Sequence, residues 1–201
     1  LVSAYLAKGN LLSVNGKYEE ALAYYKKAKE ANSKDFYVLS GLANTYKRLK
    51  QYQDAIENYK EAITIDQTNI DPYLGLAESL TQLNMNDEAV KAYLKVIEVN
   101  PANISAHIAL GNIYYKQENY VKALEEYNKI RETDNLNPEI LVKIGNIYKE
   151  NSKPQEAQKF YEQALKIDPQ NINAKFNLGL VLYDTGNYKK AKEYFKQTIQ
   201  S

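Results

Sequence analysis

The sequence of 201 residues contains no cysteine and only one histidine, His107. Without cysteine the chain has no disulfides and no thiol nucleophile, which is consistent with a reducing compartment. A zinc site built from several Cys or His ligands is excluded as well. A histidine acting as general base needs a positioned partner in a cleft, and the sequence indicates none for His107. We therefore expect a cytoplasmic protein that is not an enzyme and that holds no metal and no cofactor.

A strong charge of one sign and long apolar runs are also missing. The 26 Lys and Arg residues balance 25 Asp and Glu residues, and the formal net charge is +1. Such a chain has no overall attraction for nucleic acid or anionic lipid. No apolar run approaches the ~20 residues of a membrane-spanning helix. The eight glycines are spread along the chain and form no phosphate-binding loop. We therefore predict neither nucleic acid nor a membrane span among its interactions.

The sequence does contain a repeat of 34 residues. Residues 110–114 read LGNIY, and residues 144–148 read IGNIY. Three columns of residues keep this spacing through six copies without an insertion. A column of small residues consists of Gly9, Ala43, Ala77, Gly111, Gly145 and Gly179. An alanine column consists of Ala21, Ala55, Ala89, Ala123, Ala157 and Ala191. An aromatic column, four residues further on, consists of Tyr25, Tyr59, Tyr93, Tyr127, Tyr161 and Phe195. A fixed period of this length is typical of a repeat array.

Each copy reads as two amphipathic helices joined by a short turn. In the fourth copy Tyr120, Ala123, Tyr127 and Ile130 fall at steps of three and four residues, which places them on one helical face. Turn-forming residues separate the two helices at 15–16, 84–86, 152–154 and 185–187. Small residues allow two helices to approach closely, and the aromatic column fills the space beside them. One copy cannot bury its own apolar face, so stacked neighbours must supply the core.

These columns resemble the tetratricopeptide repeat family, whose consensus W-x2-L-G-x2-Y…A-x3-F…P they match. The resemblance implies an all-α fold, a right-handed α-solenoid superhelix of six helix-turn-helix units with about 12 antiparallel helices. The predicted units are residues 2–35, 36–69, 70–103, 104–137, 138–171 and 172–201. We interpret residues 1–201 as one solenoid. Because the chain starts at Leu1 and the last helix has no polar cap, we also expect a segment of a longer protein.

The resemblance also implies where a ligand would lie. In this family the first helix of each unit lines a concave groove, and ligands usually occupy that groove. Carried onto this chain, the predicted groove residues are Leu6, Asn10, Gly41, Asn44, Lys47, Leu74, Gly75, Glu78, Ile108, Asn112, Lys116, Val142, Lys143, Asn146, Phe176 and Asn177. The asparagines can both donate and accept hydrogen bonds, which suits a peptide backbone.

Two of these positions have two explanations. A glycine inside a helix costs about 1 kcal/mol relative to alanine, so Gly41 and Gly75 indicate that space is needed beside the backbone. The space could admit a ligand, or it could allow adjacent first helices to pack closely. The sequence favours neither explanation over the other.

We predict a non-catalytic scaffold or adaptor that binds a protein or peptide segment in the groove and that can take part in a multiprotein assembly. The carboxylate clamp that co-chaperones of this family use is not matched, because Leu6 stands where its first lysine would be. An alternative is the substrate-recruiting arm of a larger enzyme, such as a protein glycosyltransferase. The asparagine ladder of those arms runs through the column held here by Ala7, Gly41, Gly75 and Ala109. A third hypothesis is self-association, or continuation of the stack, through the uncapped last helix.

Overall fold

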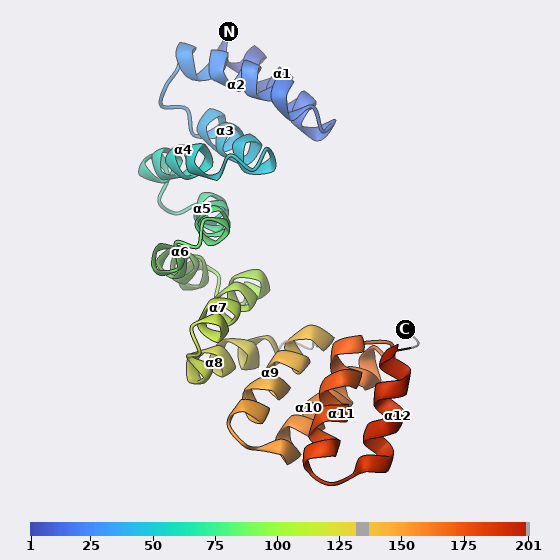
Figure 1. The fold of residues 1–201 in the computed structure, drawn as a ribbon. Coiled ribbons are helices and arrows are strands. Elements are labelled where there is room, and N and C mark those ends of the chain that lie inside the picture. The colour runs from blue at the N-terminus through green and yellow to red at the C-terminus, as the bar shows by residue number, and fades with distance from the viewer. Residues whose placement is uncertain (132–136, 200–201) are drawn as a thin grey trace. The chain divides into compact units, whose positions relative to one another are not determined.

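The computed structural model describes residues 1–131 and 137–199, and these residues form helices and connecting turns without any strand (Figure 1). Residues 132–136 of the fourth predicted unit and 200–201 of the sixth lie outside the described residues. The described helices are α1 (Val2–Val14), α2 (Tyr18–Ala31), α3 (Phe36–Arg48), α4 (Tyr52–Ile65), α5 (Ile70–Gln82), α6 (Asn86–Val99), α7 (Ile104–Lys116), α8 (Tyr120–Arg131), α9 (Pro138–Glu150), α10 (Pro154–Ile167), α11 (Ile172–Asp184) and α12 (Tyr188–Ile199). The predicted all-α solenoid of helix-turn-helix repeats is confirmed.

The chain forms two compact units, residues 1–109 and 110–201, which we describe separately. Within the first unit, α1 packs on α2, α3 on α4, and α5 on α6. Within the second, α9 packs on α10 and α11 on α12. Inside each unit, a second helix also contacts the first helix of the following repeat, as α2 does with α3 and α10 with α11. First helices contact one another too, namely α1 with α3, α3 with α5, and α9 with α11.

Most first helices begin at an asparagine or aspartate cap. The Asp35 carboxylate accepts hydrogen bonds from the backbone N–H groups of Tyr37 and Val38 at 2.9 and 3.1 Å. Asn137 caps α9 and Asn171 caps α11 in the same way. Such a side chain satisfies amide groups that have no partner inside the helix. The helix starts are therefore encoded locally, at matching positions of the repeat.

The turn inside each repeat has the same backbone conformation in all six copies. One residue has a positive φ of 56–82°, and these residues are again 34 positions apart: Gly16, Lys50, Asn84, Glu118, Ser152 and Gly186. The following amide donates to a carbonyl five residues earlier, as Gln51 does to Tyr46 at 2.9 Å. This is the Schellman ending of a helix, which favours glycine or asparagine. Lys50 and Glu118 are neither glycine nor asparagine, so the sequence does not indicate the turns of the second and fourth repeats.

The core consists of the columns that the repeat defines. The alanines of the alanine column are at most 1% exposed, and the tyrosines of the aromatic column at most 3%. The core of the first unit contains Ala21 and Tyr25 together with Leu42, and that of the second contains Ala157 and Tyr161. Small and large side chains at fixed spacing therefore produce the close helix crossings that the sequence predicts.

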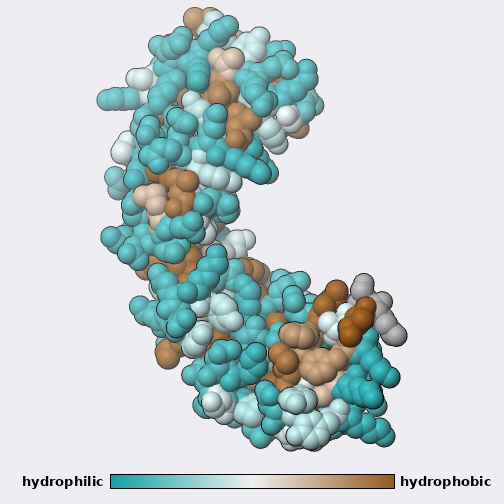
Figure 2. All heavy atoms as spheres, viewed as in Figure 1, coloured by the Kyte–Doolittle hydropathy of each residue, from teal (hydrophilic) through white to brown (hydrophobic). Residues whose placement is uncertain are grey.

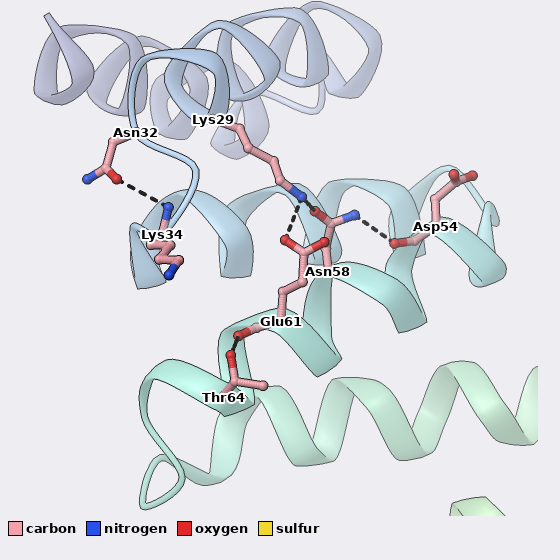
Figure 3. A network of polar contacts seen from close by, with 7 residues as sticks. All are labelled: Lys29, Asn32, Lys34, Asp54, Asn58, Glu61 and Thr64. Carbon is pink, nitrogen blue, oxygen red and sulfur yellow. Dashed lines mark hydrogen bonds and ion pairs between the residues drawn. The ribbon is translucent and has the colours of Figure 1, made fainter.

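A polar network joins the second helices of the first two repeats (Figure 3). Lys29 of α2 donates to the Asn58 side chain at 3.0 Å and forms an ion pair with Glu61 at 2.7 Å, both on α4. The Asn58 side chain in turn donates to the backbone carbonyl of Asp54 at 2.8 Å. Asn58 is only 8% exposed, so its carbonyl oxygen needs the donor that Lys29 provides.

Candidate binding face on the first helices

The predicted groove residues lie on the odd-numbered helices, and we call the surface that they form within each compact unit the first-helix face of that unit. Its asparagine column is bonded to the aromatic column of the second helices. In the first unit, the hydroxyl of Tyr25 donates to Asn10 Oδ1 at 2.7 Å, and that of Tyr59 donates to Asn44 Oδ1 at 2.6 Å. Each tyrosine lies 15 residues after its asparagine, so the pairing is part of the repeat.

The second unit repeats the same bond. The hydroxyl of Tyr127 donates to Asn112 Oδ1 at 2.9 Å, and that of Tyr161 donates to Asn146 Oδ1 at 2.7 Å. Burial raises the pKa of Tyr127 and Tyr161 well above the usual tyrosine value. The hydroxyls are therefore protonated donors at neutral pH. In these pairs each asparagine oxygen is occupied, and the amide nitrogen is left for other hydrogen bonds.

The space beside Gly41 and Gly75 is filled by tyrosine rings. A Cβ atom added at Gly41 would lie 2.6 Å from Cε1 of Tyr25, and one added at Gly75 would lie 2.2 Å from Cζ of Tyr59. Both distances are far shorter than any normal carbon–carbon contact. These contacts favour the packing explanation, with one difference from the sequence hypothesis. The close neighbour is a tyrosine on the second helix of the preceding repeat, and not a residue of an adjacent first helix.

A charged pair interrupts the asparagine column in the first unit. Glu78 on α5 takes the place of asparagine and pairs with Lys47 on α3, with Nζ and Oε2 2.6 Å apart. A cavity of about 600 Å³ lies beside this pair, and it is lined by Lys47, Arg48, Lys50, Tyr52, Glu78 and Gln82. The predicted groove set contained only Lys47 and Glu78 of these residues. The others lie at or just after helix ends, where a pattern of helical faces gives no signal.

Lysine also occupies the first-helix face of the second unit. The Nζ of Lys143 on α9 donates to Asn112 Oδ1 at 2.5 Å, so this oxygen accepts from both Lys143 and Tyr127. Burial, together with the positive charge of Lys116, lowers the pKa of Lys143. Lys116 lies one helical turn after Asn112 on α7 and is exposed. The structure thus brings Asn112, Lys116 and Lys143 to one place.

The apolar residues of the predicted set differ in how far they are exposed. Leu6, Leu74 and Ile108 are partly buried in the first unit, and Val142 is buried in the second. Phe176 is 46% exposed, although its ring lies 6.0 Å from that of Phe195. Figure 2 shows hydrophobic residues gathered over the region of α9 and α11. Asn177 follows Phe176 and is half-buried. The accessible apolar surface of this face therefore includes Phe176.

The remaining candidate chemistry is limited within the described residues. His107 is buried, and its Nε2 lies 2.9 Å from the carbonyl oxygen of Pro101. Burial and this contact are enough to account for a histidine at this position. Among residues 1–131 and 137–199, no three His, Cys, Asp or Glu side chains gather as metal ligands would. No helix in these ranges is both long and apolar enough to cross a membrane.

Comparison with known families agrees with the repeat. Models described as tetratricopeptide repeat match residues 1–68, 104–137 and 149–201, and one described as TPR repeat matches residues 77–118. The chain belongs to the tetratricopeptide repeat family. Members of this family are generally non-catalytic and act as scaffolds for protein interactions. None of the curated proteins matches the chain.

Solved structures share this fold at low sequence identity. A tetratricopeptide repeat protein from Parabacteroides merdae has a TM-score of 0.82 and 17% identity, covering 99% of this chain and 79% of that one. The C-terminal part of a repeat protein from Cytophaga hutchinsonii has a TM-score of 0.85 and 16% identity, covering 97% and 78%. YrrB, described as a TPR protein with an unusual peptide-binding site, has a TM-score of 0.76 and 24% identity, covering 85% and 88%. Because all three identities are below 25%, these structures show only that the fold is shared.

Proposed function

We propose that the chain is a non-catalytic scaffold that binds an extended segment of a partner protein on its first-helix face. The bond between each asparagine and its tyrosine is the observation that carries this proposal. With Oδ1 held by a tyrosine hydroxyl, the amide of Asn10 or Asn44 has one orientation, and its N–H groups are the free donors. Donors held in place before binding lose little entropy when a partner binds. An extended peptide offers carbonyl acceptors along its whole length, and these can accept from such donors.

The same arrangement supports the proposal in the second unit. Asn112 and Asn146 are held by Tyr127 and Tyr161, and both asparagines are half-buried. On the same first-helix face, Lys116 adds charge and Phe176 adds exposed apolar surface. YrrB shares the fold, and its described peptide-binding site is compatible with a peptide as the ligand here. Gly41 and Gly75 would act behind this face, through the tyrosines that they accommodate.

The test replaces the donors and keeps the acceptors. In the variant Asn10→Asp/Asn44→Asp, the carboxylates still accept from Tyr25 and Tyr59, but the amide donors are gone. The tagged chain is used to recover partners from a lysate of its source organism, with quantitative mass spectrometry. We expect at least one protein that wild type recovers to be reduced about tenfold or more, as loss of two hydrogen bonds of about 1 kcal/mol each implies.

A matched variant controls for the two added charges. Asn32 and Asn100 accept from backbone amides at 3.1 and 3.2 Å, and Asp66 and Asp168 do the same at the corresponding positions of other repeats. Asn32→Asp/Asn100→Asp should therefore fold normally and recover partners as wild type does. Circular dichroism of both variants checks that they have the helix content of wild type. Equal recovery by wild type and both variants would refute binding through the asparagine donors.

The first unit offers little support for the alternative of a substrate-recruiting arm. The asparagine ladder of such arms would need side chains at positions 41 and 75, where tyrosine rings already fill the space. Self-association through α12 stays a prediction. Tyr188 and Ile199 on that helix are 63% and 85% exposed. Light scattering of the chain and of a Phe195→Asp variant tests whether its mass depends on this face.

A further inference from the structure

The cavity in the first unit lies where three helix ends meet. α3 ends at Arg48, α5 ends at Gln82, and α4 begins at Tyr52, and all three residues line the cavity. Its volume of about 600 Å³ is within the usual range for ligand pockets. The cavity adjoins the first-helix face, because Lys47 and Glu78 belong to both. A segment bound on that face would therefore pass beside the cavity.

The lining of this cavity is positively charged. Lys47, Arg48 and Lys50 contribute three cations, and Glu78 is the only carboxylate. Lys47 is paired with Glu78, whereas Arg48 and Lys50 have no ion pair within residues 1–131 and 137–199. The chain as a whole carries a net charge of only +1, so this excess is local. Cations that line one concave site raise the local concentration of anionic groups.

Stabilisation of the end of α3 does not by itself explain these cations. Basic residues near a helix C-terminus do interact favourably with its dipole. Here, however, two of the last carbonyls already have backbone partners: Lys50 N donates to Lys47 O at 3.0 Å, and Gln51 N donates to Tyr46 O at 2.9 Å. The start of α4 is a positive helix end at the cavity, because its first residue Tyr52 lines it, whereas the ends of α3 and α5 are negative helix ends. The helix ends therefore do not select an anion, and the preference for one comes from the side chains of Lys47, Arg48 and Lys50.

We propose that this cavity binds carboxylate side chains of an acidic peptide segment, a stretch rich in Asp and Glu. The proposal rests on the proposed function, since the segment would be part of the partner on the first-helix face. Arg48 and Lys50 bind the carboxylates directly, and Lys47 is shared between the ligand and Glu78. The Tyr52 hydroxyl and the Gln82 amide can donate further hydrogen bonds. Glu78 opposes the ligand, so it limits affinity and excludes peptides with too few acidic residues.

The experiment uses the whole chain and two defined peptides. One is a fluorescein-labelled peptide of eight alternating Glu and Asp residues, and the other has Gln and Asn in their place. Fluorescence anisotropy measures the affinity of each at about 0.05 and about 0.5 M salt. We expect binding of the acidic peptide only, with an affinity that falls at high salt. Equal binding of the neutral peptide would overturn the proposal.

Variants assign the binding to this cavity. Arg48→Gln and Lys50→Gln should each weaken binding about two- to fivefold, which is the range typical of exposed ion pairs. Glu78→Gln should strengthen it by a similar factor, because it removes the opposing charge and frees Lys47. The control Lys34→Gln/Lys91→Gln removes two exposed lysines that have no ion pair in the described residues, and it should bind as wild type does. Equal weakening in this control, or no gain from Glu78→Gln, would show non-specific attraction and refute the proposal.

Two further results separate this proposal from its alternatives. Displacement of the acidic peptide by submillimolar inorganic phosphate would identify a phosphoryl ligand, and would refute an acidic peptide as the occupant. The lysate experiment with Asn10→Asp/Asn44→Asp tests the scaffold function independently. If its partner depends on those asparagines while the acidic peptide does not bind, the cavity proposal fails and the scaffold function stands.

Discussion

Replacement of Gly75 by alanine should destabilise the chain, although alanine is the better helix former. Alanine in the middle of a helix is favoured over glycine by about 1 kcal/mol. The added Cβ would lie 2.2 Å from Cζ and 2.4 Å from the hydroxyl oxygen of Tyr59, so the ring must move. Overpacking of this kind costs about 1–3 kcal/mol. Movement of the ring also weakens the hydrogen bond to Asn44, at a cost of about 1 kcal/mol. The net loss should be about 1–3 kcal/mol.

The sign should reverse when the ring is absent. In a Tyr59→Leu background the atoms that the new Cβ would meet are gone, and only the helix preference of alanine remains. Gly75→Ala should then stabilise this variant by about 1 kcal/mol. The assay is urea unfolding of all four proteins, followed by circular dichroism. Midpoints and slopes are compared, because a constant slope shows that the surface exposed on unfolding is unchanged.

This cycle separates the two explanations of the helix glycines. Packing requires that the effect of Gly75→Ala depends on Tyr59, with a coupling of about 2–4 kcal/mol. If the space beside Gly75 served a ligand instead, the effect of Gly75→Ala on stability would not depend on Tyr59. A Gly75→Ala variant that gains stability equally in both backgrounds would refute the packing explanation.

Three other predictions concern the turn, the tyrosines and the network between second helices. Glu118→Gly should stabilise the chain by about 0.5–1 kcal/mol in urea unfolding, because Glu118 has a φ of 58° that glycine adopts without strain. Asn84→Gly is the control and should change the stability little, because asparagine tolerates this conformation. Burial raises the pKa of Tyr127 and Tyr161, so the unfolded chain ionises first, and stability should be complete below pH ~10 and fall as the pH rises beyond it. Tyr161→Phe should make that fall less steep, as urea midpoints measured at increasing pH would show. If wild type and Tyr161→Phe lost stability equally with pH, the ring of Tyr161 would not be buried as the structure has it. Lys29→Met should lower stability by about 1 kcal/mol, since it removes the donor and the ion pair between α2 and α4, and an unchanged midpoint would show that the network contributes nothing.

The repeat period by itself determined the fold and most of the core. Residues that recur every 34 positions and fall on one helical face must be buried against a neighbouring copy, because one copy cannot bury them alone. Ala89 and Ala123 were expected at helix crossings, and both are 0% exposed. Helix content and the choice of buried face depend on spacing along the chain, which a sequence displays directly.

Tertiary structure alone decided what each inward-facing residue contacts. The side chain of Asn44 could have bound a ligand through its oxygen or through its nitrogen, but the hydroxyl of Tyr59, 15 residues later, already donates to that oxygen. The sequence indicates that space is needed beside Gly75, and only the tertiary structure shows that the ring of Tyr59 fills it. Lys50 and Gln82 come together because two turns from different repeats meet in space. Periodicity reports which side of a helix is buried, whereas contact partners depend on how helices are rotated and spaced against each other.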